Sequence, residues 1–145
     1  MRKIRVALLG FGGIARVHNN AYQQLKREGY PVELVAVCEK NTETVRQAIT
    51  INLGNDTEPL PESVKVYSCV EDLLENEEYD LADICLPTFL HKSMSVNQLL
   101  AGKHVLCEKP MALNAEDCAE MVAAERGAGL RLMIGQCLRF DKAYI

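Results

Sequence analysis

The sequence predicts an α/β protein in which helices cover both faces of a mostly parallel sheet of about six strands, a doubly wound fold. Short apolar runs alternate with longer segments of helical periodicity, which is the pattern of parallel strands joined by crossover helices. Several runs are apolar at consecutive positions, as strands buried on both faces require. The first run ends in a glycine-rich turn that leads directly into the first helical segment. Together these three observations favour a sheet enclosed between two helix layers.

Six apolar runs supply the predicted strands. Their lengths suit strands better than helices, and β-branched residues are frequent in them. Right-handed crossovers between consecutive parallel strands then give the doubly wound topology. The runs are Ile4 to Leu9, Leu34 to Cys38, Val64 to Tyr67, Leu81 to Leu86, His104 to Cys107 and Leu130 to Ile134.

Segments of helical spacing separate these runs. An apolar stripe over Val45 to Leu53 predicts a second helix, and another helix runs from about Lys92 to Ala101. The last begins after Asn114, a residue suited to capping, and Gly127 and Gly129 end it. In the first helix the residues predicted to face the sheet are Ile14, Val17, Ala21 and Leu25.

Composition excludes several classes of protein. The 145 residues suit one domain, and a net charge of -4 argues against binding to nucleic acid or to an anionic membrane. No apolar run approaches the roughly 20 residues needed to span a bilayer. The six cysteines lack metal-binding or disulfide spacing, and His18 and His104 lack ligand spacing. We therefore expect a cytoplasmic protein that binds no metal.

The glycine-rich turn, Gly10 to Ala15, fits the pattern G-x-G-x-x-G/A. Gly10 permits a tight turn, and Gly12 lets the backbone approach a pyrophosphate without an intervening side chain. Ala15 lets the following helix pack closely on the strand. The N-terminus of that helix offers N–H groups and a partial positive charge to phosphates. The turn therefore predicts dinucleotide binding.

An acidic residue at the end of the second strand completes this pattern. Glu39 stands there, where it would accept hydrogen bonds from the adenosine ribose. A carboxylate favours the 2′-hydroxyl of NAD and repels the 2′-phosphate of NADP. The neighbouring Lys40 offsets part of that repulsion, so NAD is favoured and NADP stays open. Methyltransferases also combine a glycine-rich turn with an acidic residue, and these residues alone leave that alternative open.

The second half of the chain adds two further motifs. The fourth strand continues through Pro87 and Thr88 to His91, and the fifth runs into Glu108, Lys109 and Pro110. The chain resembles the glucose-fructose oxidoreductase and inositol dehydrogenase family. The resemblance lies in these motifs, in the stretch AGKHVLCEKP at residues 101–110 and in the segment 135–140. The resemblance covers essentially the whole chain and implies a Rossmann fold.

The resemblance also implies roles for individual residues. Lys109 would be the catalytic lysine, whose ammonium can hydrogen-bond a substrate oxygen or relay its proton. Glu108 would lie by the nicotinamide ribose, and Arg139 is a weaker candidate for contacting cofactor or substrate. The residues that would hold the rest of the cofactor are Gly10, Gly12, Gly13 and Ile14 at the pyrophosphate, Glu39 at the adenosine ribose, and Pro87, Thr88 and His91 along the cleft.

Members of the family are longer and carry a second, α+β domain. We therefore expect residues 1–145 to form the dinucleotide-binding domain, with the last ten or so residues leading toward a substrate domain that this sequence lacks. Hydride transfer needs a substrate held close to the cofactor in a dry site, so the fragment by itself is expected to be inactive. The full-length protein is expected to be a homo-oligomer.

The favoured function is an NAD(P)-dependent oxidoreductase acting on a sugar, inositol or similar polyol. A noncatalytic module that senses NAD(P) is a second hypothesis, because fold alone does not fix function. Glu108, Lys109 and Pro110 argue for the enzyme, since a sensor does not need a lysine at the hydride-transfer position. An S-adenosylmethionine-dependent methyltransferase is a third hypothesis, against which the same motif and the sixth strand count.

Overall fold

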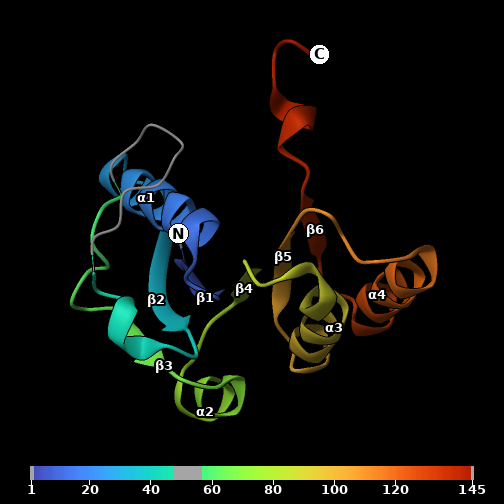
Figure 1. The fold of residues 1–145 in the computed structure, drawn as a ribbon, viewed down its shortest axis with the longest axis horizontal. Coiled ribbons are helices and arrows are strands. Elements are labelled where there is room, and N and C mark those ends of the chain that lie inside the picture. The colour runs from blue at the N-terminus through green and yellow to red at the C-terminus, as the bar shows by residue number, and fades with distance from the viewer. Residues whose placement is uncertain (1, 48–56, 145) are drawn as a thin grey trace.

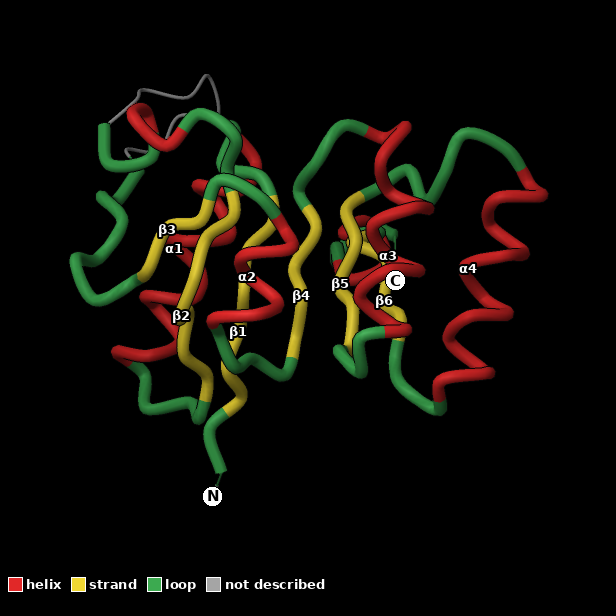
Figure 2. Tube along the Cα trace, turned by 90° about the horizontal axis from the view of Figure 1, so that it is seen from below, coloured by secondary structure: helices red, strands yellow, loops and turns green. Residues whose placement is uncertain are grey.

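One sheet of six parallel strands organises the molecule, in the order β3-β2-β1-β4-β5-β6. The computed structural model describes residues 2–47 and 57–144. Figure 2 shows the strands side by side in this order. The predicted doubly wound α/β fold is confirmed. The strands are β1 (Ile4–Leu9), β2 (Val32–Cys38), β3 (Lys65–Tyr67), β4 (Leu81–Ile84), β5 (His104–Glu108) and β6 (Leu132–Gly135).

Helices cover the sheet on both faces (Figure 1). On one face Ala15 of α1 packs with Val6 and Leu8 of β1. The opposite face of the sheet carries Ala7 and Leu9, which belong to a second buried cluster with residues of α2, α3 and α4. Successive β1 side chains thus enter opposite cores, which explains the unbroken apolar run. The helices are α1 (Gly13–Arg27), α2 (Val70–Asn76), α3 (His91–Leu100) and α4 (Ala115–Ala128).

The neighbouring strands β1 and β4 mark the point at which strand order reverses. From β1 the chain moves outward through β2 to β3, then returns to β4 and continues to β5 and β6. The connections that leave β1 and β4 therefore diverge, which opens a crevice at the carboxyl ends of these strands. This crevice is where an open α/β sheet places its ligand.

The predicted apolar stripe of α1 is wrong in part. Ile14 is 41% exposed and Ala21 is exposed, while Val17 and Leu25 are half-buried. The fully buried positions of this helix include the polar residue Asn19, whose side-chain amide donates to the carbonyl of Glu58 over 3.0 Å. Apolar periodicity therefore identified only part of the buried face of this helix.

The helix predicted over Val45 to Leu53 is not found in its described part. Thr42–Thr44 form a single 3-10 turn, Val45 follows it in a turn, and Ala48, Ile49 and Leu53 lie outside the described residues. The guanidinium of Arg16 donates to the carbonyls of Thr44 and Gln47 over 2.8 and 2.7 Å. The Thr44 carbonyl also accepts from the backbone N–H of Gln47, three residues on, over 3.2 Å.

The last helix begins and ends on the residues that its capping pattern predicts. Asn114 caps α4, because its side-chain oxygen accepts from the backbone N–H of Asp117 over 2.8 Å. Gly129 follows the helix in the left-handed conformation, with φ of 65°, while Gly127 lies inside it. None of the helices in the described ranges is long and apolar enough to cross a membrane.

Candidate functional site

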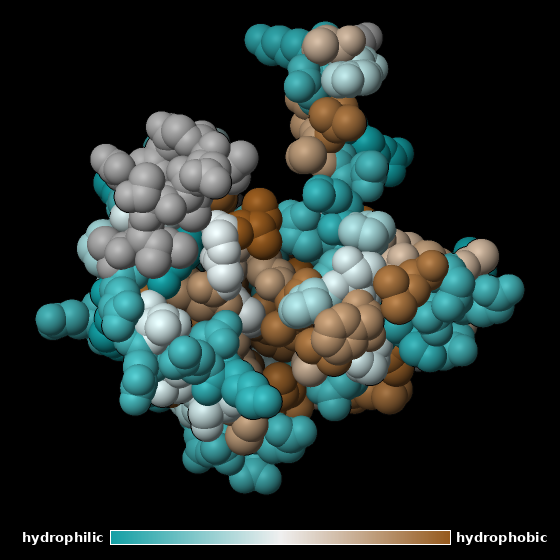
Figure 3. All heavy atoms as spheres, in the orientation of Figure 1, coloured by the Kyte–Doolittle hydropathy of each residue, from teal (hydrophilic) through white to brown (hydrophobic). Residues whose placement is uncertain are grey.

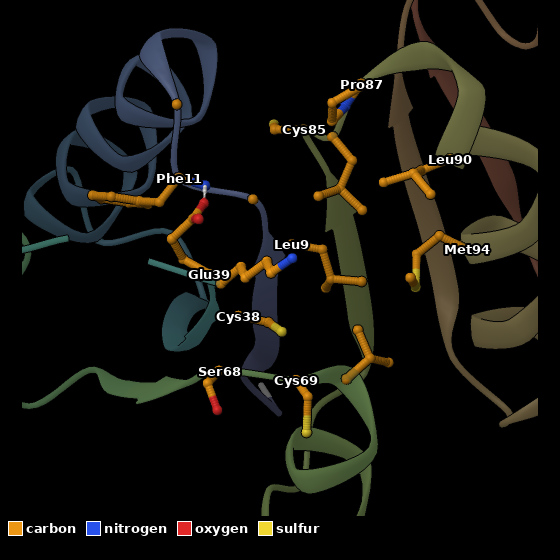
Figure 4. A pocket seen from close by; sticks show the side chains of 15 residues that line it. Leu9, Phe11, Cys38, Glu39, Ser68, Cys69, Cys85, Pro87, Leu90 and Met94 are labelled. Carbon is orange, nitrogen blue, oxygen red and sulfur yellow. Dashed lines mark hydrogen bonds between the residues drawn. The ribbon is translucent and has the colours of Figure 1, made fainter. Parts of the chain in front are cut away.

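A cleft of about 630 Å³ opens at the carboxyl ends of β1, β2 and β4. Figure 3 shows apolar residues gathered in the hollow between α1 and α3, and Figure 4 shows the side chains that line it. The cleft lies where the strand order reverses, as this fold class predicts. Four of the predicted cofactor residues, Gly10, Gly12, Glu39 and Pro87, are among the residues that line it.

Gly10 and Gly12 serve the turn in different ways. Gly10 has φ of +86°, and a β-carbon added to it would lie 2.7 Å from the carbonyl oxygen of Cys85. The fold itself therefore requires glycine there. A β-carbon at Gly12 would meet nothing within 4 Å, although the residue lines the cleft. The absence of a side chain at Gly12 keeps space free for a ligand, which is what the pyrophosphate prediction requires.

The amino end of α1 faces this turn. Gly12 caps the helix without a side-chain hydrogen bond, and the first turn contains no acidic residue. Gly13 and Ile14 open the helix, so their backbone N–H groups belong to the four that a helix leaves without internal partners. The positive end of the helix dipole is therefore available to an anion.

Glu39 lies at the rim of the cleft and braces the turn. One carboxylate oxygen accepts from the backbone N–H of Phe11 over 2.8 Å, and the other accepts from that of Asn41 over 3.0 Å (Figure 4). Sequence reasoning placed Glu39 at this position but missed its bond to the glycine-rich turn. The two hydrogen bonds hold the negative charge in one place beside Lys40, which also lines the cleft.

Other walls of the cleft come from residues that sequence reasoning did not single out. Ser68 and Cys69 follow β3, while Leu90 and Met94 lie on the side of α3. Figure 4 shows Leu90 and Met94 across the cleft from Glu39. The carboxyl ends of parallel strands share one edge, so the residues after β3 were the signal that could have found Ser68 and Cys69.

His91 lies beneath the cleft wall and does not line the cleft among the described residues. Its side chain is buried, with Nδ1 2.8 Å from the carbonyl oxygen of Pro110 and Nε2 2.8 Å from that of Leu86. The ring thus joins the loop after β4 to the loop after β5. Thr88 opens the short 3-10 turn Thr88–Leu90 that follows Pro87. The structure thus gives His91 a supporting position beneath the cleft wall, and its role in cofactor binding stays a prediction.

Glu108 and Lys109 lie at the end of β5, outside the residues that line the cleft. One Glu108 oxygen accepts from the backbone N–H of Lys109 over 3.1 Å. The Lys109 side chain belongs to an exposed residue, and the peptide bond between Lys109 and Pro110 is cis. Arg139 lies in the exposed segment after β6. The structure therefore leaves the lysine free to meet a ligand from solvent.

A polar network lies between α1 and the sheet next to this strand end. His18 Nδ1 is 2.7 Å from a carboxylate oxygen of Asp83, and Nε2 is 3.1 Å from Glu108. The hydroxyl of Tyr22 donates to the same Asp83 oxygen over 2.7 Å. Burial, reinforced by the Asp83 carboxylate, raises the pKa of Tyr22, so the phenol stays protonated and donates.

Cys85 completes the network. Its sulfur lies 3.8 Å from Asp83 and 3.6 Å from His18 Nδ1, and burial raises the pKa of its thiol. Atoms of His18, Asp83 and Cys85 that can bind metals all lie within 4.8 Å of one another. Hydrogen bonds account for this closeness, so we assign no metal to the three residues. The expectation that the chain binds no metal stays a prediction.

The chain is similar in sequence to curated sugar and polyol dehydrogenases. It is 29% identical over 137 residues to inositol 2-dehydrogenase of Salmonella typhimurium, which covers 94% of this chain and 38% of that protein. It is 30% identical over 146 residues to D-apiose dehydrogenase of Paraburkholderia graminis, covering 99% of this chain and 35% of the relative. The chain thus spans well under half the length of these relatives.

Solved structures of similar fold include two dehydrogenases. The WlbA dehydrogenase of Bordetella pertussis, solved with NADH and UDP-GlcNAcA, superposes with a TM-score of 0.81 at 31% identity, over 99% of this chain and 40% of that one. For myo-inositol 2-dehydrogenase of Lactobacillus plantarum the TM-score is 0.76 at 26% identity, over 99% and 39%. A family model described as an oxidoreductase family with an NAD-binding Rossmann fold matches residues 4–136. The chain therefore belongs to this family of NAD-binding oxidoreductases, as its glycine-rich turn and Glu-Lys-Pro motif indicated.

Proposed function

We propose that this chain binds NAD in the cleft between β1 and β4 and belongs to an enzyme that moves hydride between the nicotinamide and a sugar, inositol or similar polyol. The observation that carries the proposal is the joint presence of an open glycine-rich turn, a fixed acidic residue and a lysine at the end of β5. The similar proteins from Salmonella and Paraburkholderia are dehydrogenases of an inositol and of a sugar, which supports this substrate class.

The cleft fits a dinucleotide at both of its distinctive groups. The open space over Gly12 and the uncapped start of α1 would take the pyrophosphate, with Gly13 and Ile14 donating backbone N–H groups. Glu39 would accept from the adenosine ribose while keeping its bond to the Phe11 N–H, because each carboxylate oxygen accepts more than one hydrogen bond. The cofactor would then run from Glu39 toward Pro87 and Thr88.

Lys109 would act on the substrate oxygen. The bound nicotinamide supplies the chemistry of hydride transfer, which leaves the protein to bind, orient and manage one proton. An ammonium within hydrogen-bond distance of the reacting oxygen stabilises the negative charge that develops there and can exchange its proton with it. Glu108, whose carboxylate accepts from the Lys109 N–H, would keep the start of this loop beside the cofactor.

Calorimetric titration with NADH, NADPH and S-adenosylmethionine tests the proposal. Gly12→Val is the decisive variant, because its β-carbon would enter the ligand space and meet no protein atom within 4 Å. Gly127→Ala in α4 is the matched control, since a β-carbon there also meets nothing and lies far along the chain from the turn.

We expect the unchanged chain and Gly127→Ala to bind NADH, and Gly12→Val to keep its circular dichroism spectrum but lose at least tenfold in affinity. S-adenosylmethionine should not bind. Binding of S-adenosylmethionine in preference to both nicotinamide cofactors, or equal NADH affinity in Gly12→Val, would contradict the proposed site.

A further inference from the structure

His18 is held between two carboxylates that come from different strands. Asp83 lies 2.7 Å from one ring nitrogen and Glu108 lies 3.1 Å from the other. The Asp83 side chain is fully buried, that of Glu108 is 13% exposed, and that of His18 is 19% exposed. The ring therefore connects the interior of the sheet to the strand end that carries Lys109.

The fold brings these groups together by simple periodicities. His18 and Tyr22 are four residues apart, so they share one face of α1. Asp83 pairs with Leu106 in the parallel register, and Glu108 stands two residues beyond Leu106, so both carboxylates face the same side of the sheet. That side is the one that α1 covers, as the packing of Ala15 on β1 shows.

Both ring nitrogens face acceptors, so the ring must carry both protons to satisfy them. Burial lowers the pKa of His18, but hydrogen bonds and charge from Asp83, followed by those from Glu108, raise it by more, and its pKa lies above the ordinary value. Among the described residues, the titratable groups that face the ring are Asp83 on β4, Cys85 directly after β4, Glu108 on β5 and Tyr22 on α1. None of these groups adds a positive charge that would oppose the imidazolium.

Glu108 is confined on its other sides as well. Its second oxygen accepts from the Lys109 N–H. A β-carbon added to Gly135 of β6 would lie 2.9 Å from the Glu108 oxygen that faces His18, so Gly135 provides the space that this carboxylate occupies. The backbone at Lys109 therefore depends on a carboxylate whose free movement is limited by His18 and Gly135.

We propose that His18 in its imidazolium form is a positioning residue, which bridges Asp83 and Glu108 and thereby fixes the Lys109 segment at the carboxyl end of β5. This inference rests on the proposed function, because it concerns the loop of the proposed catalytic lysine. When the ring loses one proton, the remaining N–H stays with the fully buried Asp83, which has no water to replace it. Nε2 then ceases to donate to Glu108, and the Lys109 segment is released.

Nuclear magnetic resonance of the chain tests this inference without requiring turnover. The sequence contains only three histidines, so the His18 ring and the Lys109 amide can both be followed as pH rises from 5 to 9. His18→Gln removes the titrating bridge, and Asp83→Asn removes the buried charge with little change in shape. His104→Gln is the matched control, because His104 lies at the opposite end of β5, where its Nδ1 accepts from the backbone N–H of Arg131 over 3.1 Å.

We expect the Lys109 amide to titrate with the same midpoint as the His18 ring, above the ordinary value for histidine. Asp83→Asn should lower both midpoints together by about one pH unit or more, because an opposite charge is lost. His18→Gln should abolish the Lys109 titration and His104→Gln should leave it unchanged. If His18→Gln fails to fold, the paired shift in Asp83→Asn still decides the matter.

A Lys109 amide that does not change with pH, or one that titrates independently of His18, would overturn the inference. NADH is added to the same samples to separate this result from the proposed function. NADH binding with no link between His18 and Lys109 refutes only the positioning role. A His18-linked Lys109 titration in a chain that binds no nicotinamide cofactor refutes the proposed function, and with it the cofactor-related purpose of the link.

Discussion

At the end of β2, the carboxylate of Glu39 contributes both to the fold and to the cleft. It accepts from the backbone N–H groups of Phe11 and Asn41, and it lines the cleft. These bonds fix the direction of its negative charge before any ligand arrives, which reduces the ordering required on binding. Lys40 also lines the cleft, so the preference between NAD and NADP depends on two opposite charges.

The change Glu39→Gln should shift this preference toward NADP. Two unit charges about 4 Å apart repel by about 1 kcal/mol in water and more in a partly buried cleft, so losing the carboxylate should raise NADPH affinity relative to NADH by roughly tenfold. Parallel titrations with both cofactors measure the ratio. The exposed Glu43 supplies the control, and Glu43→Gln should leave the ratio unchanged. An unchanged ratio of NADPH to NADH affinity in Glu39→Gln would show that Glu39 does not contact the adenosine ribose.

Sequence reasoning predicted the residues of the turn well because backbone conformation limits the choice of side chain. Gly10 has positive φ and Ala15 is completely buried, as the motif requires. His91 was harder, since the sequence placed it near the ligand edge but could not show that two backbone carbonyls enclose its ring. For His18 the sequence indicated only that metal-ligand spacing is absent, because its partners Asp83 and Glu108 lie 65 and 90 residues away in the sequence.

Among the secondary-structure elements, α1 departs most from the usual rule of an apolar buried face. It buries Arg16 and Asn19 and turns His18 and Tyr22 to the sheet, while Ile14 is largely exposed. Periodicity could not predict this face, because the buried polar side chains form hydrogen bonds with partners on other parts of the chain. The strand β1 was easier to predict, since its residues from Val6 to Leu9 form a continuous apolar run that is buried on both faces.

The change Tyr22→Phe tests whether these polar contacts stabilise α1 on the sheet. It removes a hydrogen bond to a carboxylate, and such bonds contribute about 1.5–3 kcal/mol. We expect the free energy of unfolding in urea to fall by about that amount. Tyr30 is 59% exposed, so Tyr30→Phe should change stability by no more than about 0.5 kcal/mol. Equal effects of the two substitutions would contradict the network's role.

The pH dependence of stability should report His18. The pKa of His18 is raised in the folded state. Its contribution to the free energy of unfolding is therefore fully present below the histidine pKa of the unfolded chain, about 6.5, and is lost as pH rises through the pKa of the folded state. Urea unfolding should therefore show stability falling as pH rises above about 6.5, before the exposed thiols of the unfolded chain ionise at about pH 8.5. His18→Gln should remove most of this slope while His104→Gln keeps it. A slope that persists in His18→Gln must come from another group.

At the scale of the whole molecule, one sheet separates two buried clusters, and its strand order places the cleft at the reversal between β1 and β4. The α/β pattern and the number of strands were readable from the sequence, because alternating apolar runs and helices allow few topologies. The region around Val45 was not, because Arg16 hydrogen-bonds to carbonyls there. A hydrogen bond from a side chain far away in the sequence to backbone carbonyls leaves no periodic pattern in the local sequence.

Cofactor binding should stabilise the whole fold. A ligand present at 100 times its dissociation constant adds about 2.7 kcal/mol to stability, which for a domain of this size raises Tm by roughly 5–10 °C. Thermal unfolding followed by circular dichroism, with and without saturating NADH, measures this shift. Gly12→Val should unfold near the temperature of the unchanged chain and gain nothing from NADH. A comparable gain in Gly12→Val would indicate that NADH binds elsewhere.

The location of the bound cofactor tests the central claim most directly. A second, polar pocket of about 450 Å³ lies at the amino end of the sheet, where Arg2, Arg5 and Lys103 offer cationic groups to a phosphate. Backbone amide shifts on adding NADH distinguish the two positions. If NADH occupies the cleft between β1 and β4, the amides of Gly12, Glu39 and Leu90 should respond at one common dissociation constant. Shifts confined to Lys103, His104 and their neighbours would contradict this location of the cofactor.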